Sequence, residues 1–157
     1  MLRVTKLADY GIVMLTFFAT DQESTCTARD IANSARLPLP VVSKVLKLLS
    51  KAGLLTSQRG IKGGYALAHP PQQITVASII RAVEGPIAVT ECSEKNHDCD
   101  LVRGCPVRTN WHLINQAIHS ALEQITLDQM TRPLHQTLIN LTLPGEPSAA
   151  SGFKQLG

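Results

Sequence analysis

Residues 37–67 read LPLPVVSKVLKLLSKAGLLTSQRGIKGGYAL and carry the strongest structural signal in this chain of 157 residues. A helix is predicted from Pro40 to Ala52, because apolar residues three and four positions apart form one face of it: Val42, Val45, Leu46 and Leu49. Gly53 follows where a helix commonly ends in a left-handed residue. Two short β-prone runs flank the glycine-rich turn at residues 58–64, and this pattern predicts a hairpin.

Two further helices are predicted before this segment. The first covers Thr5 to Thr20, and the second is opened by Thr27 and Asp30, which have the spacing of a capping box, and is stopped by Pro38. Two short helices with a brief turn and a glycine-tipped hairpin make a winged helix–turn–helix. We therefore expect a mainly α fold with a small β-hairpin wing, and a DNA-binding domain over residues 1–86.

The predicted third helix and hairpin turn are basic. Residues 1–70 hold nine Lys and Arg against four Asp and Glu, although the whole chain has a net charge of only +3. A helix fits the major groove of B-DNA, whose width is about 12 Å, and a basic hairpin can contact phosphates or the minor groove. The bland alternative is a helical subdomain with a solvated lysine face. The candidate DNA-binding residues are Ser43 for a base edge, and Lys44, Lys47, Arg59 and Lys62 for phosphates or the minor groove.

Several classes of protein are disfavoured by the sequence. No apolar run approaches the roughly 20 residues that span a membrane, and the residues after Ala19 make a poor signal-peptide cleavage site. There is no Ser/His/Asp set, phosphate-cradling glycine loop or two-metal carboxylate cluster. We expect a cytoplasmic protein that is not an enzyme and takes no small-molecule substrate.

Three cysteines lie in a polar segment, and we predict that residues 87–105 form a metal-binding loop. Cys92, Cys99 and Cys105 are spaced C-x6-C-x5-C, and thiolates are the preferred ligands of iron–sulfur clusters and of zinc. Pro106 suits the first turn of a following helix, whose N-terminus would favour nearby thiolates.

The spacing alone leaves an iron–sulfur cluster, a structural zinc ion and inert cysteines as alternatives. Zinc sites more often contain close CxxC pairs, inert cysteines rarely gather in a polar loop, and three cysteines cannot pair among themselves. Cys26 lies far away and is expected to be structural. A further ligand is required, and the local candidates are His97, Asp98, Asp100 and His112.

The last third of the chain is predicted to begin with a long helix from Pro106 to Ile125. Its apolar residues alternate spacings of three and four, as in a heptad seam: Trp111, Ile114, Ile118, Ala121 and Ile125. The seam predicts pairing with a second subunit, and packing against its own domain is the alternative. A shorter helix is predicted from Leu127 to Leu141, so residues 106–141 form the dimerisation unit. Residues 142–157, rich in Pro, Gly, Ser and Ala, are predicted to be a disordered tail.

Six segments together resemble a known family. They are the three-cysteine loop, LADYG at 7–11, LPLPVVSK at 37–44, RGIKGGY at 59–65, EGPI at 84–87 and TECS at 90–93. Over residues 1–133 the chain is similar to the bacterial iron–sulfur and nitric-oxide responsive regulators that include IscR, NsrR and RirA. Within that family it is most similar to members that control the proteobacterial SUF iron–sulfur assembly operon.

The resemblance implies a homodimer that binds a [2Fe–2S] or [4Fe–4S] cluster through Cys92, Cys99 and Cys105. IscR-like members use a His three residues after the last cysteine as the fourth ligand, and Arg108 stands at that position here. NsrR-like members use an Asp from the first helix of the partner subunit, which corresponds to Asp9. The resemblance therefore favours Asp9 donated across the dimer, with His97 as the alternative.

The function expected from the resemblance is a cluster-dependent repressor of SUF genes that binds a pseudo-palindromic double-stranded DNA operator. Loss of the cluster would release Asp9 and shift the two DNA-reading heads relative to each other. Arg59 matches the family's wing arginine, which enters the minor groove, whereas Ser43 replaces a Glu of IscR-like members, so base preference is expected to differ. The alternatives are a zinc-stabilised transcription factor without cluster sensing and a nitric-oxide sensor of the NsrR type.

Overall fold

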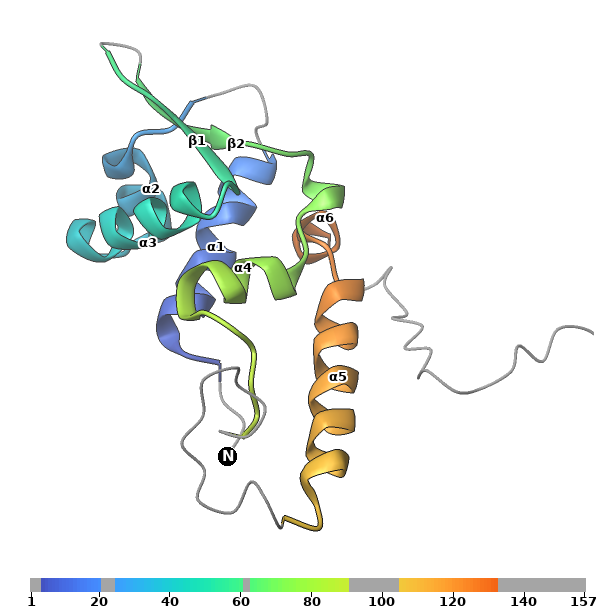
Figure 1. Ribbon diagram of the computed structural model, residues 1–157. Coiled ribbons are helices and arrows are strands. Elements are labelled where there is room, and N and C mark those ends of the chain that lie inside the picture. The colour runs from blue at the N-terminus through green and yellow to red at the C-terminus, as the bar shows by residue number, and fades with distance from the viewer. Residues whose placement is uncertain (1–3, 21–24, 61–62, 91–104, 133–157) are drawn as a thin grey trace, which may run out of the picture.

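The computed structural model describes residues 4–20, 25–60, 63–90 and 105–132, and it is mainly helical with one two-stranded antiparallel sheet (Figure 1). In chain order its elements are α1 (Lys6–Thr20), α2 (Ala28–Ala35), α3 (Leu39–Lys51), β1 (Leu55–Gln58), β2 (Gly64–Leu67), the 3₁₀ helix η1 (Pro71–Gln73), α4 (Val76–Glu84), α5 (Arg108–Gln124) and α6 (Leu127–Thr131).

The predicted winged helix–turn–helix is confirmed, because α2 and α3 are joined by a short turn and β1 and β2 pair as a hairpin, with Leu55 opposite Leu67. The Thr27 and Asp30 capping box is present at the start of α2. One boundary differs from the prediction. α2 ends at Ala35, where Arg36 adopts a left-handed φ of 53°, so the helix stops before Pro38 is reached. Pro38 instead directly precedes α3.

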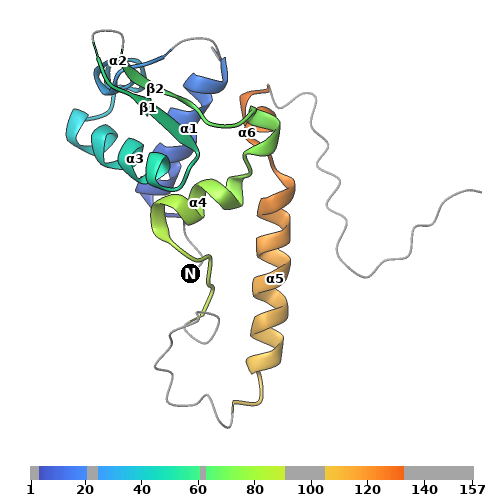
Figure 2. The same cartoon turned by 45° about the horizontal axis from the view of Figure 1, so that its top comes forward.

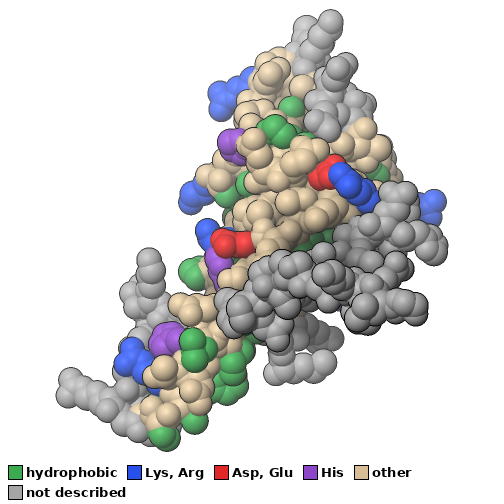
Figure 3. Space-filling model, turned by 90° about the vertical axis from the view of Figure 1, so that its right-hand side faces the viewer, with side chains coloured by type: hydrophobic (Ala, Val, Ile, Leu, Met, Phe, Trp, Pro, Cys, Tyr) green, Lys and Arg blue, Asp and Glu red, His purple; other side chains and the backbone are tan. Residues whose placement is uncertain are grey.

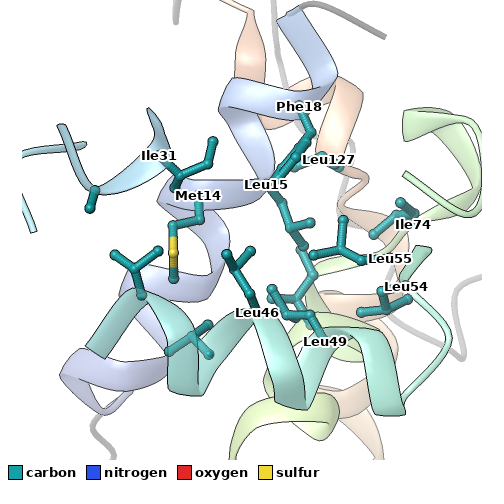
Figure 4. Close-up of a cluster of buried hydrophobic side chains, with 14 residues drawn as sticks. Met14, Leu15, Phe18, Ile31, Leu46, Leu49, Leu54, Leu55, Ile74 and Leu127 are labelled. Atoms are coloured by element: carbon teal, nitrogen blue, oxygen red, sulfur yellow. The ribbon is translucent and has the colours of Figure 1, made fainter. Parts of the chain in front are cut away.

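One hydrophobic core joins these elements (Figure 4). The largest buried side chains of α1, Met14, Leu15 and Phe18, are at most 1% exposed, and they meet Leu46 and Leu49 of α3. Full burial of one such side chain contributes about 1.5–3 kcal/mol. The core therefore holds α3 firmly against α1, with the polar side of α3 turned outward.

The short helix α6 belongs to the same core. Leu127 is completely buried beside residues of α1, although it lies near the C-terminal end of the described chain. Backbone hydrogen bonds fix the connection: the Leu127 N–H donates to Ile74 O at 2.8 Å, and the Val76 N–H donates to Ile125 O at 2.8 Å. We call α1–α4, the hairpin, η1 and α6 together the head. Of the predicted helix Leu127–Leu141, residues 133–141 lie outside the described residues.

The long helix α5 projects from the head. Figures 1 and 2 show that its end meets α4 and α6, whereas its start lies at the opposite end of the molecule from the hairpin. None of the 17 residues of α5 is buried. Within the described ranges, no helix combines the length and apolar character that crossing a bilayer requires.

Candidate nucleic-acid interface and metal-ligand site

The hairpin, α3 and the start of α2 enclose a groove with a volume of about 490 Å³. Lys47 and Ser50 of α3 line one side, and Ser57 and Arg59 line the other, with Thr27 at the start of α2. The groove therefore presents two cationic side chains beside four hydroxyl groups, the fourth being that of Tyr65 on β2. These groups donate hydrogen bonds and match the anionic phosphate backbone of a nucleic acid.

The structure places the predicted α3 residues on its outward side. Lys44 and Lys47 are exposed and Ser43 is half-buried, whereas Val42 and Val45 on the inward side are completely buried. Arg59 is exposed directly after β1, so the wing and α3 present cations together. Lys62 lies outside the described residues.

The hairpin is attached to the residue just before the N-cap of α2 by a contact that the sequence analysis missed. Cys26 and Tyr65 form an isolated antiparallel bridge, in which the Cys26 N–H donates to Tyr65 O at 3.0 Å and the Tyr65 N–H donates to Cys26 O at 2.8 Å. A Cβ atom on Gly64 would lie 2.9 Å from Cys26 O, so only glycine permits this approach. The structural role expected of Cys26 is thus to orient the wing. In the sequence, the glycine at position 64 is the feature that could have indicated this close approach.

The start of α1 is attached to the end of α4. Glu84 accepts hydrogen bonds from the Thr5 hydroxyl and from the Thr5 N–H, the latter at 3.1 Å. A carboxylate is favourable at this position, because it faces the positive N-terminal end of α1. Asp9 is exposed in the first turn of the same helix, so its carboxylate is accessible to a ligand or to a second subunit.

Cys105 lies three residues before Arg108, the first residue of α5. The residue is half-buried, and the Arg108 N–H at the start of α5 donates to its carbonyl oxygen at 3.4 Å. A cysteine thiolate is a ligand for soft metals and iron–sulfur clusters. The chemistry of Cys105 and Asp9 therefore fits an iron–sulfur centre.

Of the other predicted ligands near the cysteines, one lies within the described residues. Cys92, Cys99 and His97 lie outside the described residues, as do Asp98 and Asp100, whereas His112 is half-buried on α5. Within residues 4–20, 25–60, 63–90 and 105–132, no group of three His, Cys, Asp or Glu side chains is placed to hold a metal.

The structure divides the predicted apolar seam of α5 between two faces. Ile118 lines a small pocket next to α4, and Ile125 packs against the buried Val76 and Ile80. Ile114, in contrast, is 44% exposed, and its neighbour Leu113 is 60% exposed. In Figure 3 hydrophobic side chains gather along the projecting lower part of the molecule, where α5 lies. Packing of α5 against its own chain therefore accounts for only part of the predicted apolar seam.

Polar contacts also join α5 to α4. The Arg81 guanidinium lies 2.6 Å from Nε2 of His119 and 3.8 Å from a carboxylate oxygen of Glu123. All three side chains are partly exposed to water, so these contacts orient α5 more than they stabilise it.

A basic helix held against a hydrophobic core, with a glycine-dependent basic hairpin beside it, defines the winged helix–turn–helix class of DNA-binding proteins. The model of one family, Rrf2, described as "Iron-dependent Transcriptional regulator", matches residues 4–133. The chain belongs to the Rrf2 family.

Curated relatives agree with this assignment. The protein rrf2 of Nitratidesulfovibrio vulgaris is 33% identical over 132 residues, which cover 83% of this chain and 88% of the relative. The regulator NsrR of Bacillus licheniformis is 32% identical over 133 residues, covering 83% of this chain and 89% of the relative. The resemblance to IscR- and NsrR-like regulators is thereby confirmed at the level of the family.

Solved structures confirm the fold class. CymR, the global cysteine regulator of B. subtilis, aligns with a TM-score of 0.64 at 30% identity, covering 83% of this chain and 97% of CymR. IscR of T. potens aligns with a TM-score of 0.61 at 32% identity, covering 82% of this chain and 85% of IscR. The protein is accordingly an Rrf2-family DNA-binding transcriptional regulator, and the relatives named here are transcriptional regulators.

Proposed function

We propose that this protein is an iron–sulfur cluster-dependent repressor of SUF iron–sulfur assembly genes. The observation that carries the proposal is the half-buried Cys105 near the start of α5, the helix that projects from the DNA-reading head. Cys92 and Cys99 precede it in the sequence and complete a set of three thiolates. A cluster bound there would supply a centre sensitive to oxidation and to ligand exchange.

The fourth ligand in this proposal is Asp9 of a partner subunit, with His97 as the alternative. Asp9 is exposed at the start of α1, and α1 is tied to α4 through Thr5 and Glu84. A bond from Asp9 to a centre on the other subunit would therefore set the position of one head relative to the other. Its loss would release that restraint and change the affinity for an operator with two half-sites.

The proposed domain organisation follows from the same features. Residues 1–86 read DNA, residues 87–105 bind the cluster, residues 106–141 carry dimerisation and the C-terminal helix, and residues 142–157 form a tail. The exposed apolar residues of α5 support a homodimer, and the groove beside α3 supports a double-stranded DNA operator. The proposed DNA contacts are Ser43, Lys44, Lys47, Arg59 and Lys62. Binding to chromosomal DNA would place the protein in the cytoplasm.

Members of the family differ in what they respond to, so the iron–sulfur assignment has alternatives. The family model is described as iron-dependent, whereas CymR is a cysteine regulator. The similarity to NsrR supports a nitric-oxide sensor as the second candidate, because the same thiolates would serve it. A structural zinc ion is the third possibility and is an outcome of the experiment that follows.

Anaerobic purification tests the proposal. We expect a brown protein that absorbs between about 320 and 420 nm and contains iron and acid-labile sulfide. Cys92→Ala should lose the colour while the dimer remains folded, and Cys26→Ala, at the hairpin, should retain the colour. A colourless protein with one zinc ion per subunit would overturn the cluster assignment. Exposure of the brown protein to nitric oxide, followed by an operator-binding assay, separates the two sensing candidates.

A further inference from the structure

A side chain of α5 holds the backbone just before the cysteine segment. Oδ1 of Asn115 accepts a hydrogen bond from the Val89 N–H at 3.1 Å, across 26 positions of the sequence. Both residues are half-buried. Loss of the acceptor would leave the Val89 N–H only partly accessible to water, and an unsatisfied N–H is costly in such a position.

Both ends of the cysteine segment, Val89 and Cys105, are therefore attached to α5. Cys105 lies three residues before Arg108, the first residue of α5, and its carbonyl oxygen accepts a hydrogen bond from the Arg108 N–H. Asn115 lies seven residues beyond Arg108, or about 10 Å along the helix axis. The stretch between Val89 and Cys105 could span roughly 50 Å if it were extended. The hydrogen bond therefore restricts the separation of its two ends far more than chain length does.

Apolar contacts near Val89 cannot supply the same restraint. Pro86, Ile87 and Ala88 line a pocket of about 190 Å³ together with Ile118 and Leu122 of α5. Such contacts are non-directional, so they tolerate sliding of the backbone along the helix. A hydrogen bond depends on distance and angle and fixes which backbone group meets Asn115.

We propose that Asn115 is a positioning residue for the thiolate site and acts on Cys92 through the backbone of Val89. Cys92 is three residues beyond Val89, so the hydrogen bond sets where the chain that carries this ligand begins. The inference rests on the proposed function, because it requires a metal centre at Cys92, Cys99 and Cys105. Groups that orient metal ligands without touching the metal typically change affinity or activity about 10- to 100-fold.

The test compares three variants of the full-length protein. Asn115→Ala removes the acceptor, Asn115→Asp keeps an oxygen at the same position, and Gln116→Ala removes an exposed amide from the next residue of α5. Two readouts are measured: the rate at which a ferrous-iron chelator bleaches the visible absorption under anaerobic conditions, and hydrogen exchange of the Val89 amide in the metal-free protein.

Asn115→Ala should bleach about tenfold faster than the parent protein, and its Val89 amide should exchange faster. Asn115→Asp should restore both values to within about threefold of the parent, and Gln116→Ala should change neither. Equal bleaching rates in Asn115→Ala and the parent would overturn the inference, as would an Asn115→Asp variant that behaves like Asn115→Ala in both readouts. A parent protein that holds no iron would instead overturn the proposed function, and the exchange measurement would still report on the hydrogen bond.

Discussion

The helices α3 and α5 are both amphipathic, yet they differ in how much of the apolar face is buried. In α3, four of 13 residues are buried in the core, whereas α5 has none buried among its 17 residues. Leu113 of α5 is 60% exposed, although Leu46 of α3 is completely buried. A helix is stabilised mainly by packing of its apolar face. The comparison therefore indicates that α3 is stabilised by the core of its own chain, whereas the outer face of α5 is the surface that the proposed dimer would cover.

The largest effect is expected from Leu127→Ala in α6. Leu127 is completely buried in the head, so its truncation should lower the free energy of unfolding by about 2–5 kcal/mol. Urea denaturation followed by circular dichroism measures this change. Met130→Ala, at a 45% exposed position of the same helix, is the control and should cost far less. Equal losses for the two variants would show that α6 is not part of the head in solution.

A charge on the outer face of α5 should separate subunits and leave the head folded. Leu113→Glu would bury a carboxylate in the proposed dimer interface, and we expect the dimer to weaken by about 2 kcal/mol, or roughly thirtyfold in Kd. Sedimentation velocity measures the dimer fraction. Ser34→Glu places the same charge at an exposed position of α2, away from α5, and should have little effect. An unchanged dimer in Leu113→Glu would mean that subunits pair through another surface.

The wing arginine should affect DNA binding without affecting the fold. Arg59→Ala removes a cation from the groove beside α3, so we expect about a tenfold loss of operator affinity at fixed salt, greatest for sites with A/T-rich minor grooves. Fluorescence anisotropy with labelled operators measures it. Arg108→Ala, at the start of α5, removes the same charge far from the wing and serves as the control. Equal losses in the two variants would reduce the role of Arg59 to net charge.

The smallest effect concerns the cap of α2. Hydrogen bonds from the Thr27 hydroxyl and N–H hold the pKa of the Asp30 carboxyl below its ordinary value of 3.8. The ionised carboxylate thus stabilises the folded protein above that value, and this contribution is lost as pH falls through the lower pKa of the folded state.

Asp30→Asn should therefore lower the thermal midpoint slightly at about pH 6, and the difference from the parent should shrink as the pH falls below about 4. Asp128→Asn, which removes an acid paired with Arg132 at the far side of the head, is the matched control. A difference between Asp30→Asn and the parent that stays constant over this range would show that the Asp30 charge contributes nothing to the cap.

Local patterns in the sequence predicted most elements of the head. The capping box of Thr27 and the turn at Gly53 each depend on groups within about four residues of one another, and the glycine-rich hairpin pairs residues no more than twelve positions apart. Their energies are largely independent of the rest of the molecule, so the third helix and the wing were predicted within one or two residues. For the same reason Lys44, Lys47 and Arg59 could be assigned to the outer surface before the structure was known.

Which distant residues contact one another was decided by the tertiary structure alone. The pattern that predicted a seam on α5 could not separate Ile118, which faces α4, from Ile114, which is exposed. The backbone bridge at Cys26 and the Asn115 hydrogen bond leave no periodic pattern in the sequence. Leu127 meets Ile74 although 53 positions separate them. Periodicity shows that a residue is apolar, whereas burial depends on which distant surface the folded chain brings against it.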